Sequence, residues 1–293
     1  MRFVDVEPVA GERALEVRAG GRKYLVAGDL HVGIEDELDR RGIRVPDQTD
    51  RTLSRFVKLI EERQPDRLVL LGDVKHQVPF TEKWEGRKVF RLLEALSALL
   101  PVTVVSGNHD GGIEGMAPGG VEIVGSLVLS GQGARGKGHG TGTVVVRRPL
   151  PRAPCPSPLR PVCVGLVHGH AWPPEKLMEC KTLVVAHTHP SVALCDERGR
   201  AATEPCWLRA RFIGKQTKKH YKAPYPELVV MPAFNDLRAG QPVNEARGRL
   251  LGPLFRNGLV DVPAAKVYLT DGTFLGPVRD LLVSRSPFRG RQK

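Results

Sequence analysis

The stretch LVVAHTHP, Leu183 to Pro190, places two histidines one residue apart at the point where an apolar run ends. The four apolar residues predict a buried strand, and Pro190 is a poor residue to continue it. A single His-x-His pair is equally consistent with a polar turn and with a ligand site. Its meaning therefore depends on how the other predicted strands of the chain end.

Four more apolar runs end in the same kind of residue. Together, the five endings carry Asp29 and His31, then Asp73 with Lys75 and His76, then Asn108 with His109 and Asp110, then His168 and His170, and finally His187 and His189. Open α/β sheets hold their sites beyond the carboxyl ends of the strands, so we expect these side chains to meet. A histidine packed in a core needs one hydrogen-bond partner, which does not explain five matching endings.

The segments between the first three runs have helical periodicity. One amphipathic helix is predicted to begin near Pro46 and to include Phe56, and a second includes Val89 and closes near Pro101. This alternation predicts βαβ units that build a largely parallel sheet. The hairpin-like pieces after residue 190, including 227–234, are expected to be antiparallel and to complete a second sheet, with turns at 196–199 and 271–272.

Length and composition predict one domain over residues 1–283 of the 293-residue chain. A Gly-, Pro- and Arg-rich excursion at about 131–161 is either an insertion without a role or a basic flap that touches nucleic acid, and 284–293 is a short basic tail. No apolar stretch is long enough to span a membrane, and the start lacks a signal-peptide profile, so a cytoplasmic location is expected. The five cysteines contain no CxxC pair, so buried thiols are expected rather than structural zinc.

The net charge of +12 is unevenly distributed along the chain. Residues 1–130 hold 18 Lys and Arg against 21 Asp and Glu, whereas residues 131–293 hold 26 against 11. The basic second part suits a polyanionic partner such as nucleic acid. The alternative is an arginine-rich surface that is simply solvated.

The residue types at the strand ends indicate metal chemistry. Neutral imidazole and carboxylate groups together suit zinc, manganese or iron. Seven candidate ligands are too many for one ion. With one bridging carboxylate they suit two ions about 4 Å apart, an arrangement that clamps the attacking and leaving oxygens in phosphoryl transfer.

The order of these motifs resembles that of the calcineurin-like metallophosphoesterases. The runs D-x-H, G-D, G-N-H-D, a later histidine and H-x-H follow in sequence over residues 28–190, with Ala186 where the family usually has glycine. The longer segments LGDVKH, GNHDGGIE, HGHAWP, AHTHPSV, MPAFNDLRAG and YLTDGTFLG are similar to the archaeal SbcD-related (ICC-like) phosphoesterases. The resemblance implies an α/β fold, a four-layer α-β-β-α sandwich of two mixed sheets with a dimetal site at the strand carboxyl ends.

The resemblance also implies a role for each residue. The first metal would be held by Asp29, His31 and His189, the second by Asn108, His168 and His187, with Asp73 bridging them. His109 would be the catalytic histidine with Asp110 beside it, and a metal-bound hydroxide would attack in line. His168 is preferred to His170 as the ligand because it directly follows the apolar run. Lys75, His76 and His170 would contact substrate or steady their loops, and Asn235 is expected to be a packing or turn residue.

The family resemblance leaves the substrate open. Its phosphoprotein phosphatases carry GDxVDRG and GNHE, whereas this chain has GDVKHQV and GNHD, so protein phosphatase activity is not expected. The basic second part favours a DNA nuclease linked to repair. The resemblance implies two divalent ions, with manganese preferred to zinc, iron, nickel or cobalt. A helicase or repair partner and a homodimer are further expectations from the resemblance. An aromatic content of 5% offers few stacking platforms, and the related repair nucleases are longer. The alternatives are a small-molecule phosphodiesterase or phosphomonoesterase, and a nucleic-acid-binding or scaffold subunit with an inactive metal site.

Overall fold

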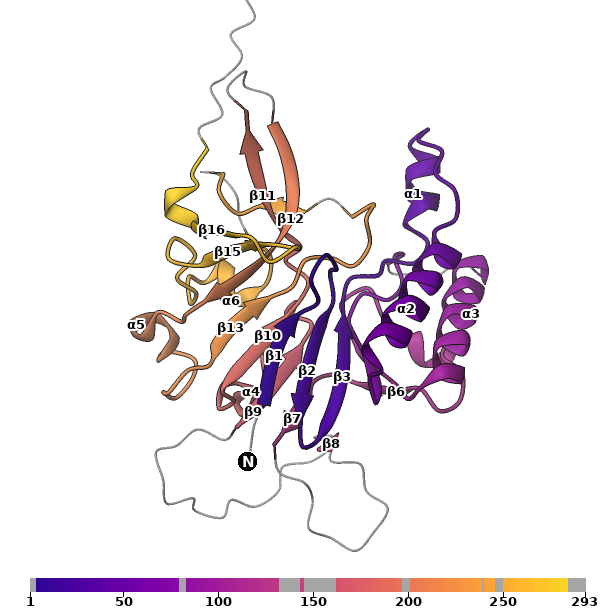
Figure 1. Cartoon of the computed structure of the whole chain (residues 1–293), viewed down its shortest axis with the longest axis horizontal. Helices are drawn as coiled ribbons and strands as arrows, with labels where there is room; N and C mark the ends of the chain where they lie inside the picture. Colours follow the sequence, from indigo (N-terminus) through magenta and orange to yellow (C-terminus); the bar gives the residue numbers. More distant parts are fainter. Residues whose placement is uncertain are drawn as a thin grey trace, which may run out of the picture.

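The computed structural model describes residues 4–78, 83–131, 143–144, 162–196, 201–238, 240–245 and 250–283. These residues form two β-sheets packed face to face, with helices on the outer faces (Figure 1). Most of the predicted excursion at 131–161, the turn after Asp196 and the 284–293 tail lie outside the described residues.

The first sheet contains the predicted βαβ units. Its strands follow one another in chain order: β1 (Val4–Pro8), β2 (Leu15–Ala19), β3 (Arg22–Ala27), β4 (Arg67–Leu71), β5 (Val102–Val105) and β6 (Glu122–Val124). Strands β3 to β6 are parallel, and β1 and β2 add an antiparallel hairpin that the sequence pattern did not predict. The two predicted helices are confirmed as α2 (Thr49–Arg63) and α3 (Lys83–Leu99), and a short α1 (Ile34–Arg40) precedes them.

The second sheet is mixed. Its strands are β7 (Leu127–Ser130), β8 (Thr143–Val144), β9 (Cys163–Val167), β10 (Thr182–Val185), β11 (Pro190–Cys195), β12 (Ala201–Ala210), β13 (Glu227–Val230), β14 (Gln241–Pro242), β15 (Lys266–Leu269) and β16 (Phe274–Pro277). The prediction that 227–234 is antiparallel is wrong for one of its two neighbours. Strand β13 lies between β10 and β12. It is antiparallel to β12, as expected, but parallel to β10. The turn at Asp271–Gly272 is confirmed between β15 and β16.

Alternation along the strands separates three hydrophobic layers. In β4, Val69 and Leu71 point between the two sheets, whereas Leu68 and Leu70 pack toward α2 and α3. In the second sheet, Val184 faces the first sheet and its neighbours in β10 face outward. The outermost layer there consists of single-turn helices α4 (Glu175–Met178), α5 (Gly214–Thr217) and α6 (Pro253–Arg256). The four-layer architecture is therefore confirmed, with one helical layer much thinner than the other.

The described residues allow a comparison with two expectations from composition, those on cysteines and on membrane-spanning helices. Cys163, Cys180 and Cys206 are buried free thiols, and Cys195 is free and exposed. None of the described helices combines the length and the apolar character that crossing a membrane requires.

Candidate metal centre and active site

The carboxyl ends of strands from both sheets meet at one edge of the molecule. Asp29 follows β3, Asp73 follows β4 and His168 follows β9. The Nε2 atom of His168 lies 2.9 Å from Oδ1 of Asp29 and 3.5 Å from Oδ2 of Asp73. A single imidazole of the second sheet therefore joins two carboxylates of the first.

One group of buried donors comprises Asp29, His31 and His189, whose ligand atoms all lie within 4.8 Å of one another. The Nε2 atom of His31 is buried and makes no hydrogen bond to any described residue, whereas Nε2 of His189 lies 3.2 Å from Oδ1 of Asp29. A buried nitrogen without a partner costs free energy unless something outside the chain satisfies it. Oxygen and imidazole donors with free lone pairs fit a divalent cation, so this group could hold a metal ion.

A second group comprises Asp73, His168 and His187, also within 4.8 Å of one another. Asn108, which the resemblance adds to this set, is exposed on the loop that follows β5. On the same loop, the backbone N–H of His109 donates to Oδ1 of Asp73 at 2.9 Å. Oδ2 of Asp73 lies 3.8 Å from Nε2 of His31 and 3.5 Å from Nε2 of His168, so its carboxylate is beside both groups. The assignment of individual residues to two metal ions remains a prediction from the family resemblance.

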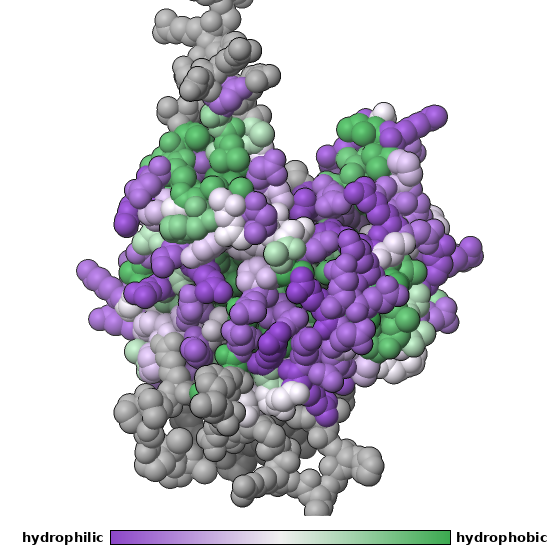
Figure 2. Space-filling view, viewed as in Figure 1, coloured by the Kyte–Doolittle hydropathy of each residue, from purple (hydrophilic) through white to green (hydrophobic). Residues whose placement is uncertain are grey.

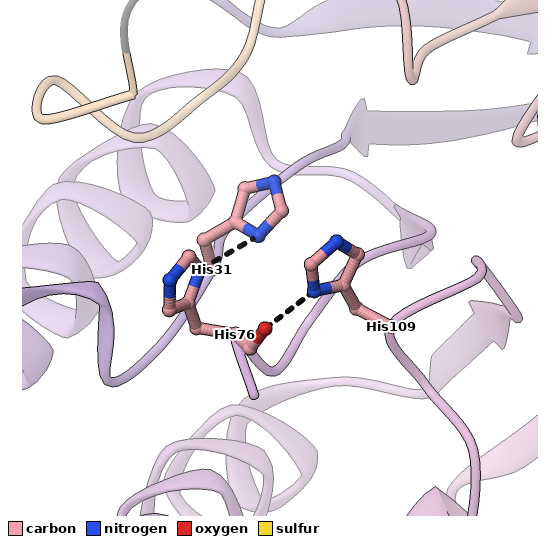
Figure 3. A group of neighbouring side chains, drawn as sticks. All are labelled: His31, His76 and His109. Carbon is pink, nitrogen blue, oxygen red and sulfur yellow. Dashed lines mark hydrogen bonds between the residues drawn. The ribbon is translucent and has the colours of Figure 1, made fainter. Parts of the chain in front are cut away.

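Figure 3 shows a third cluster, formed by His31, His76 and His109. The Nδ1 atoms of His31 and His76 are 3.3 Å apart, and Nδ1 of His109 donates to the backbone oxygen of His76. Because a carbonyl oxygen can only accept, the His109 proton is fixed on Nδ1, and its Nε2 faces Oδ2 of Asp73 at 3.9 Å. His109 is therefore oriented with one ring nitrogen free to exchange a proton.

The other predicted side chains hold loops or lie at the rim. Asp110 is buried and accepts the backbone N–H groups of Gly107 and Val74, each at 2.8 Å, rather than contacting the His109 ring. Lys75 is 1% exposed and donates to the backbone oxygen of Gln77 at 2.6 Å, so its ammonium supports its own loop. His76 is buried and its Nε2 contacts the carboxylate of Glu37.

His168 and His170 compete for one ligand position in the sequence. The structure buries His168 fully and leaves His170 exposed, with the Nδ1 atoms of the two rings 3.0 Å apart. Of the two, His168 is the residue whose Nε2 reaches Asp29 and Asp73, and His170 contacts the opposite ring nitrogen of His168.

Backbone strain is concentrated at this edge. Six described residues other than glycine have φ in the left-handed region, and five of them are predicted ligands, namely Asp29 (57°), His31 (47°), Asp73 (49°), His187 (61°) and His189 (44°). Such conformations are unfavourable for residues with a Cβ and persist where the surrounding structure enforces them. Their clustering is a signal of function that does not depend on any sequence motif.

Two small residues let the strand ends approach each other. A Cβ at Gly72 would lie 2.3 Å from the ring of His168, which is too close for any side chain. A Cβ at Gly28 would lie 2.9 Å from the methyl group of Ala186. Ala186 stands where the family usually has glycine, and Gly28 provides the space that its methyl group needs.

Burial and neighbouring charges shift the pKa values of three imidazoles at the site, two downward and one upward. Burial lowers the pKa of His31 well below its usual value, and burial together with the charge of His168 lowers the pKa of His187 to about 3. Both rings are therefore neutral at pH 7, with a lone pair available. Burial also acts on His168, but its hydrogen bond to Asp29 and the charges of Asp29 and Asp73 outweigh it and raise the pKa of His168.

Two residues at this edge were not predicted as functional. Nε of Arg238 donates to Nδ1 of His189 at 3.2 Å, and Nδ2 of Asn235 donates to the backbone oxygen of Leu30 at 2.6 Å, inside the loop that carries Asp29 and His31. Asn235 is thus a packing residue, as expected, but one that supports the ligands. Both follow β13, so a sixth strand ending at the same edge was the available signal.

The model of the calcineurin-like phosphoesterase family matches residues 22–191. This chain belongs to that family, whose members are dimetal-dependent hydrolases of phosphoesters. The match covers every strand end that carries a predicted ligand. The narrower similarity to the SbcD-related phosphoesterases remains a prediction from the motifs.

Two solved structures are similar to this chain at low sequence identity. The nuclease MPE of Pseudomonas putida is 18% identical, with 91% of this chain and 98% of that chain covered and a TM-score of 0.46. YfcE, a phosphoesterase from E. coli, is 15% identical, with 86% and 96% covered and a TM-score of 0.38. No curated protein sequence matches the chain.

Proposed function

We propose that this protein is a dimetal phosphodiesterase that cleaves DNA. The observation that carries the chemistry is the pair of buried donor groups, one with Asp29, His31 and His189 and one with Asp73, His168 and His187. Divalent cations held there, with manganese the first choice for carboxylate and imidazole donors, would stabilise the charge that develops on the phosphoryl oxygens. Asp73 lies beside both groups and is assigned the bridging position.

His109 is assigned the proton transfer to the leaving oxygen. Its Nδ1–H is held by the backbone oxygen of His76, and its side chain is 21% exposed, so Nε2 is open toward an incoming phosphoester. Asp110 keeps the loops of His109 and Asp73 together through backbone hydrogen bonds, which makes it a positioning residue. A general acid in this position typically contributes about 10²–10⁴-fold to the rate.

The choice of DNA rests on charge. Residues 131–293 carry 26 Lys and Arg against 11 Asp and Glu, and they include the run KQTKKHYK from Lys215 to Lys222. Binding of a polyanion to such a surface is driven by release of counterions and weakens steeply with salt. The link to repair, and to a helicase or repair partner, comes from the sequence resemblance to the SbcD-related phosphoesterases.

The test is Mn²⁺-dependent cleavage of end-labelled single- and double-stranded DNA at low and moderate salt. Bis-p-nitrophenyl phosphate serves as a parallel substrate, and the His109→Ala variant serves as the blank. We expect wild type to cleave DNA and the small diester, and the variant to cleave neither at a comparable rate.

The other outcomes distinguish the alternatives. Turnover of the small diester without cleavage of DNA would contradict the nuclease proposal and indicate a small-molecule phosphodiesterase. Binding of DNA without turnover in any divalent metal would indicate a nucleic-acid-binding or scaffold subunit.

A further inference from the structure

A pocket of about 270 Å³ adjoins the metal centre on the side of His189. Its lining residues come from the β1–β2 loop, the start of β11, strand β12 and the segment after β13. Ten residues line it: Arg13, His189, Pro190, Ser191, Thr203, Pro205, Ala233, Asp236, Arg238 and Gly240. Its volume of about 270 Å³ is just below the range of ligand sites, about 300–1,000 Å³, so it suits a phosphate with part of a sugar rather than a whole nucleotide pair.

The charge around the pocket is positive. Its single carboxylate, Asp236, is already paired with Arg13 at 3.2 Å, with Arg51 at 3.3 Å and with Arg55 at 3.6 Å. Arg238 lies at the end adjoining the centre, with its Nε bonded to His189. Figure 2 shows a notch in the surface between α1 and the β11–β12 hairpin, with hydrophobic residues on the hairpin and mostly hydrophilic residues below the notch. An anion would therefore meet guanidinium groups that are only partly compensated.

Ser191 supplies an independent signal for a ligand. Its side chain is 1% exposed, lines the pocket, and its Oγ has no hydrogen-bond partner within the described part of the chain. A buried hydroxyl without a hydrogen-bond partner is unfavourable, so its presence is explained if a ligand oxygen accepts its hydrogen bond. Gly240 allows this close packing, because a Cβ there would lie 2.5 Å from Cβ of Ser191.

We propose that this pocket binds the phosphate next to the scissile phosphate in a nucleic acid strand, through Arg238 and Ser191. The proposal rests on the proposed function, because a scissile phosphate at the metal centre would place the neighbouring phosphate of its strand beside His189. The two-phosphate requirement would make a polynucleotide a better substrate than a simple diester. Arg238 is the specificity-determining residue in this account.

The experiment measures kcat and KM with Mn²⁺ for four substrates. These are bis-p-nitrophenyl phosphate, the dinucleotide TpT, and TpT with an added phosphate at its 5′ or its 3′ end. For wild type we expect one of the two phosphorylated dinucleotides to have a kcat/KM at least about tenfold above TpT, as a charge-assisted hydrogen bond provides. Which of the two is preferred gives the direction of the strand.

The Arg238→Gln variant should lose this preference, mainly through KM. Its hydrogen bond to His189 is lost as well, so turnover of bis-p-nitrophenyl phosphate should also fall, but by a smaller factor than turnover of the preferred dinucleotide. The matched control is Arg51→Gln, which removes a 71% exposed partner of the same Asp236 that does not line the pocket, and which should keep the preference. Ser191→Ala should raise KM for the preferred dinucleotide a few-fold without lowering the melting temperature, because no protein hydrogen bond is lost.

Two results would overturn the pocket assignment. One is equal kcat/KM for TpT and both phosphorylated forms in wild type. The other is an equal loss on all four substrates in Arg238→Gln, which is what a role confined to orienting His189 would give. With either result, wild type still turns over bis-p-nitrophenyl phosphate with Mn²⁺, whereas failure of the proposed function would abolish that turnover in wild type itself.

Discussion

His109 has one ring nitrogen occupied and one free, and this division defines its proposed role. The Nδ1–H of His109 donates to the backbone oxygen of His76. His109 is not a member of the donor group that contains Asp29 or of the one that contains Asp73. Loss of the ring should therefore remove proton transfer without removing metal. We predict that His109→Ala binds as much Mn²⁺ as wild type and turns over bis-p-nitrophenyl phosphate about 10²–10⁴-fold more slowly.

Metal analysis and steady-state kinetics on the same preparation check this prediction. His220→Ala is a suitable control, because His220 is an exposed histidine that stacks on Trp172, with ring centroids 4.5 Å apart. Turnover by His109→Ala close to that of wild type would show that the proton comes from another group.

The raised pKa of His168 predicts how metal affinity depends on pH. A metal ion needs the neutral ring, and a raised pKa means that more of His168 is protonated near pH 7 than an ordinary histidine would be. Metal affinity should thus fall as the pH is lowered from 8 to 6, and binding should release protons. His187, with a pKa of about 3, adds no proton in this range.

Calorimetry of Mn²⁺ binding in two buffers with different ionisation enthalpies measures the released protons directly. Heats that do not depend on the buffer, with equal affinity at pH 6 and pH 8, would contradict the charged state assigned to His168.

For individual residues, the sequence indicates which side chains are candidates for the site better than it indicates which atoms they contact. The five strand endings bring out Asp29, Asp73 and His168 because a polar group directly after an apolar run is visible in one dimension. Arg238 was missed because its contact with His189 joins segments 49 residues apart and follows no periodic pattern. The loop-supporting position of Lys75 was one of two open interpretations, since the spacing alone cannot tell a buried ammonium from an exposed one.

Among the elements, α1 depends on a single lysine for its attachment to α3. Lys88 on α3 contacts Glu35 at 2.9 Å and Asp36 at 3.1 Å on α1, and Asp47 at 3.1 Å before α2. Burial lowers the pKa of Lys88, but its hydrogen bonds to the three carboxylates outweigh this and raise it. The helix also carries Glu37, which contacts His76 at the centre.

We predict that Lys88→Met lowers the free energy of unfolding by about 1–3 kcal/mol, because it leaves the buried Glu35 carboxylate unpaired. Burial raises the pKa of Asp47, but the hydrogen bonds of its carboxylate to Thr49 and Lys88 outweigh burial, and the pKa is lowered. The stabilisation that Asp47 contributes is therefore present above its unfolded pKa of about 4 and is lost as the pH falls below that value. The difference between wild type and variant should accordingly shrink in acid.

Denaturant unfolding at pH 7 and pH 3.5 measures both effects. Lys58→Met is the matched control. Lys58 is 71% exposed and pairs with Glu62 at 3.8 Å, so its loss should change stability by under about 0.5 kcal/mol. An equal, small effect of both substitutions would show that Lys88 does not brace α1.

Helices could be predicted from the spacing of apolar residues where that spacing repeats over several turns. Helices α2 and α3 were predicted because their apolar residues repeat at helical spacing, and Phe56 and Val89 are fully buried as that spacing requires. The β1–β2 hairpin was missed because its strands are short and rich in charge. The direction of β13 was missed because a strand's own sequence does not say which neighbours it will have.

For the whole molecule, side chains from both sheets contribute to a single site. The four-layer arrangement came from the family resemblance, since no residue pattern specifies how two sheets stack. The thin outer layer of α4, α5 and α6 had no counterpart in the sequence, because single-turn helices are too short to show periodicity.

If DNA is bound along the basic surface, its affinity must depend on salt. Each phosphate neutralised should contribute about 0.7–0.9 to the slope of log K against log salt. We predict a slope magnitude of at least about 3 for single-stranded DNA, measured by fluorescence anisotropy with His109→Ala to prevent cleavage. A slope near zero would mean that the positive charge of residues 131–293 is only a solvated surface.

The central claim is that two metal ions are needed for turnover, and a Mn²⁺ titration of metal-stripped protein tests it most directly. Bound metal and hydrolysis of bis-p-nitrophenyl phosphate are measured at each addition, for wild type and for Asp73→Asn. The account predicts two ions per wild-type chain, turnover that rises as the second ion binds, and fewer than two ions in the variant. Full turnover with one ion or none, or full occupancy in Asp73→Asn, would contradict it.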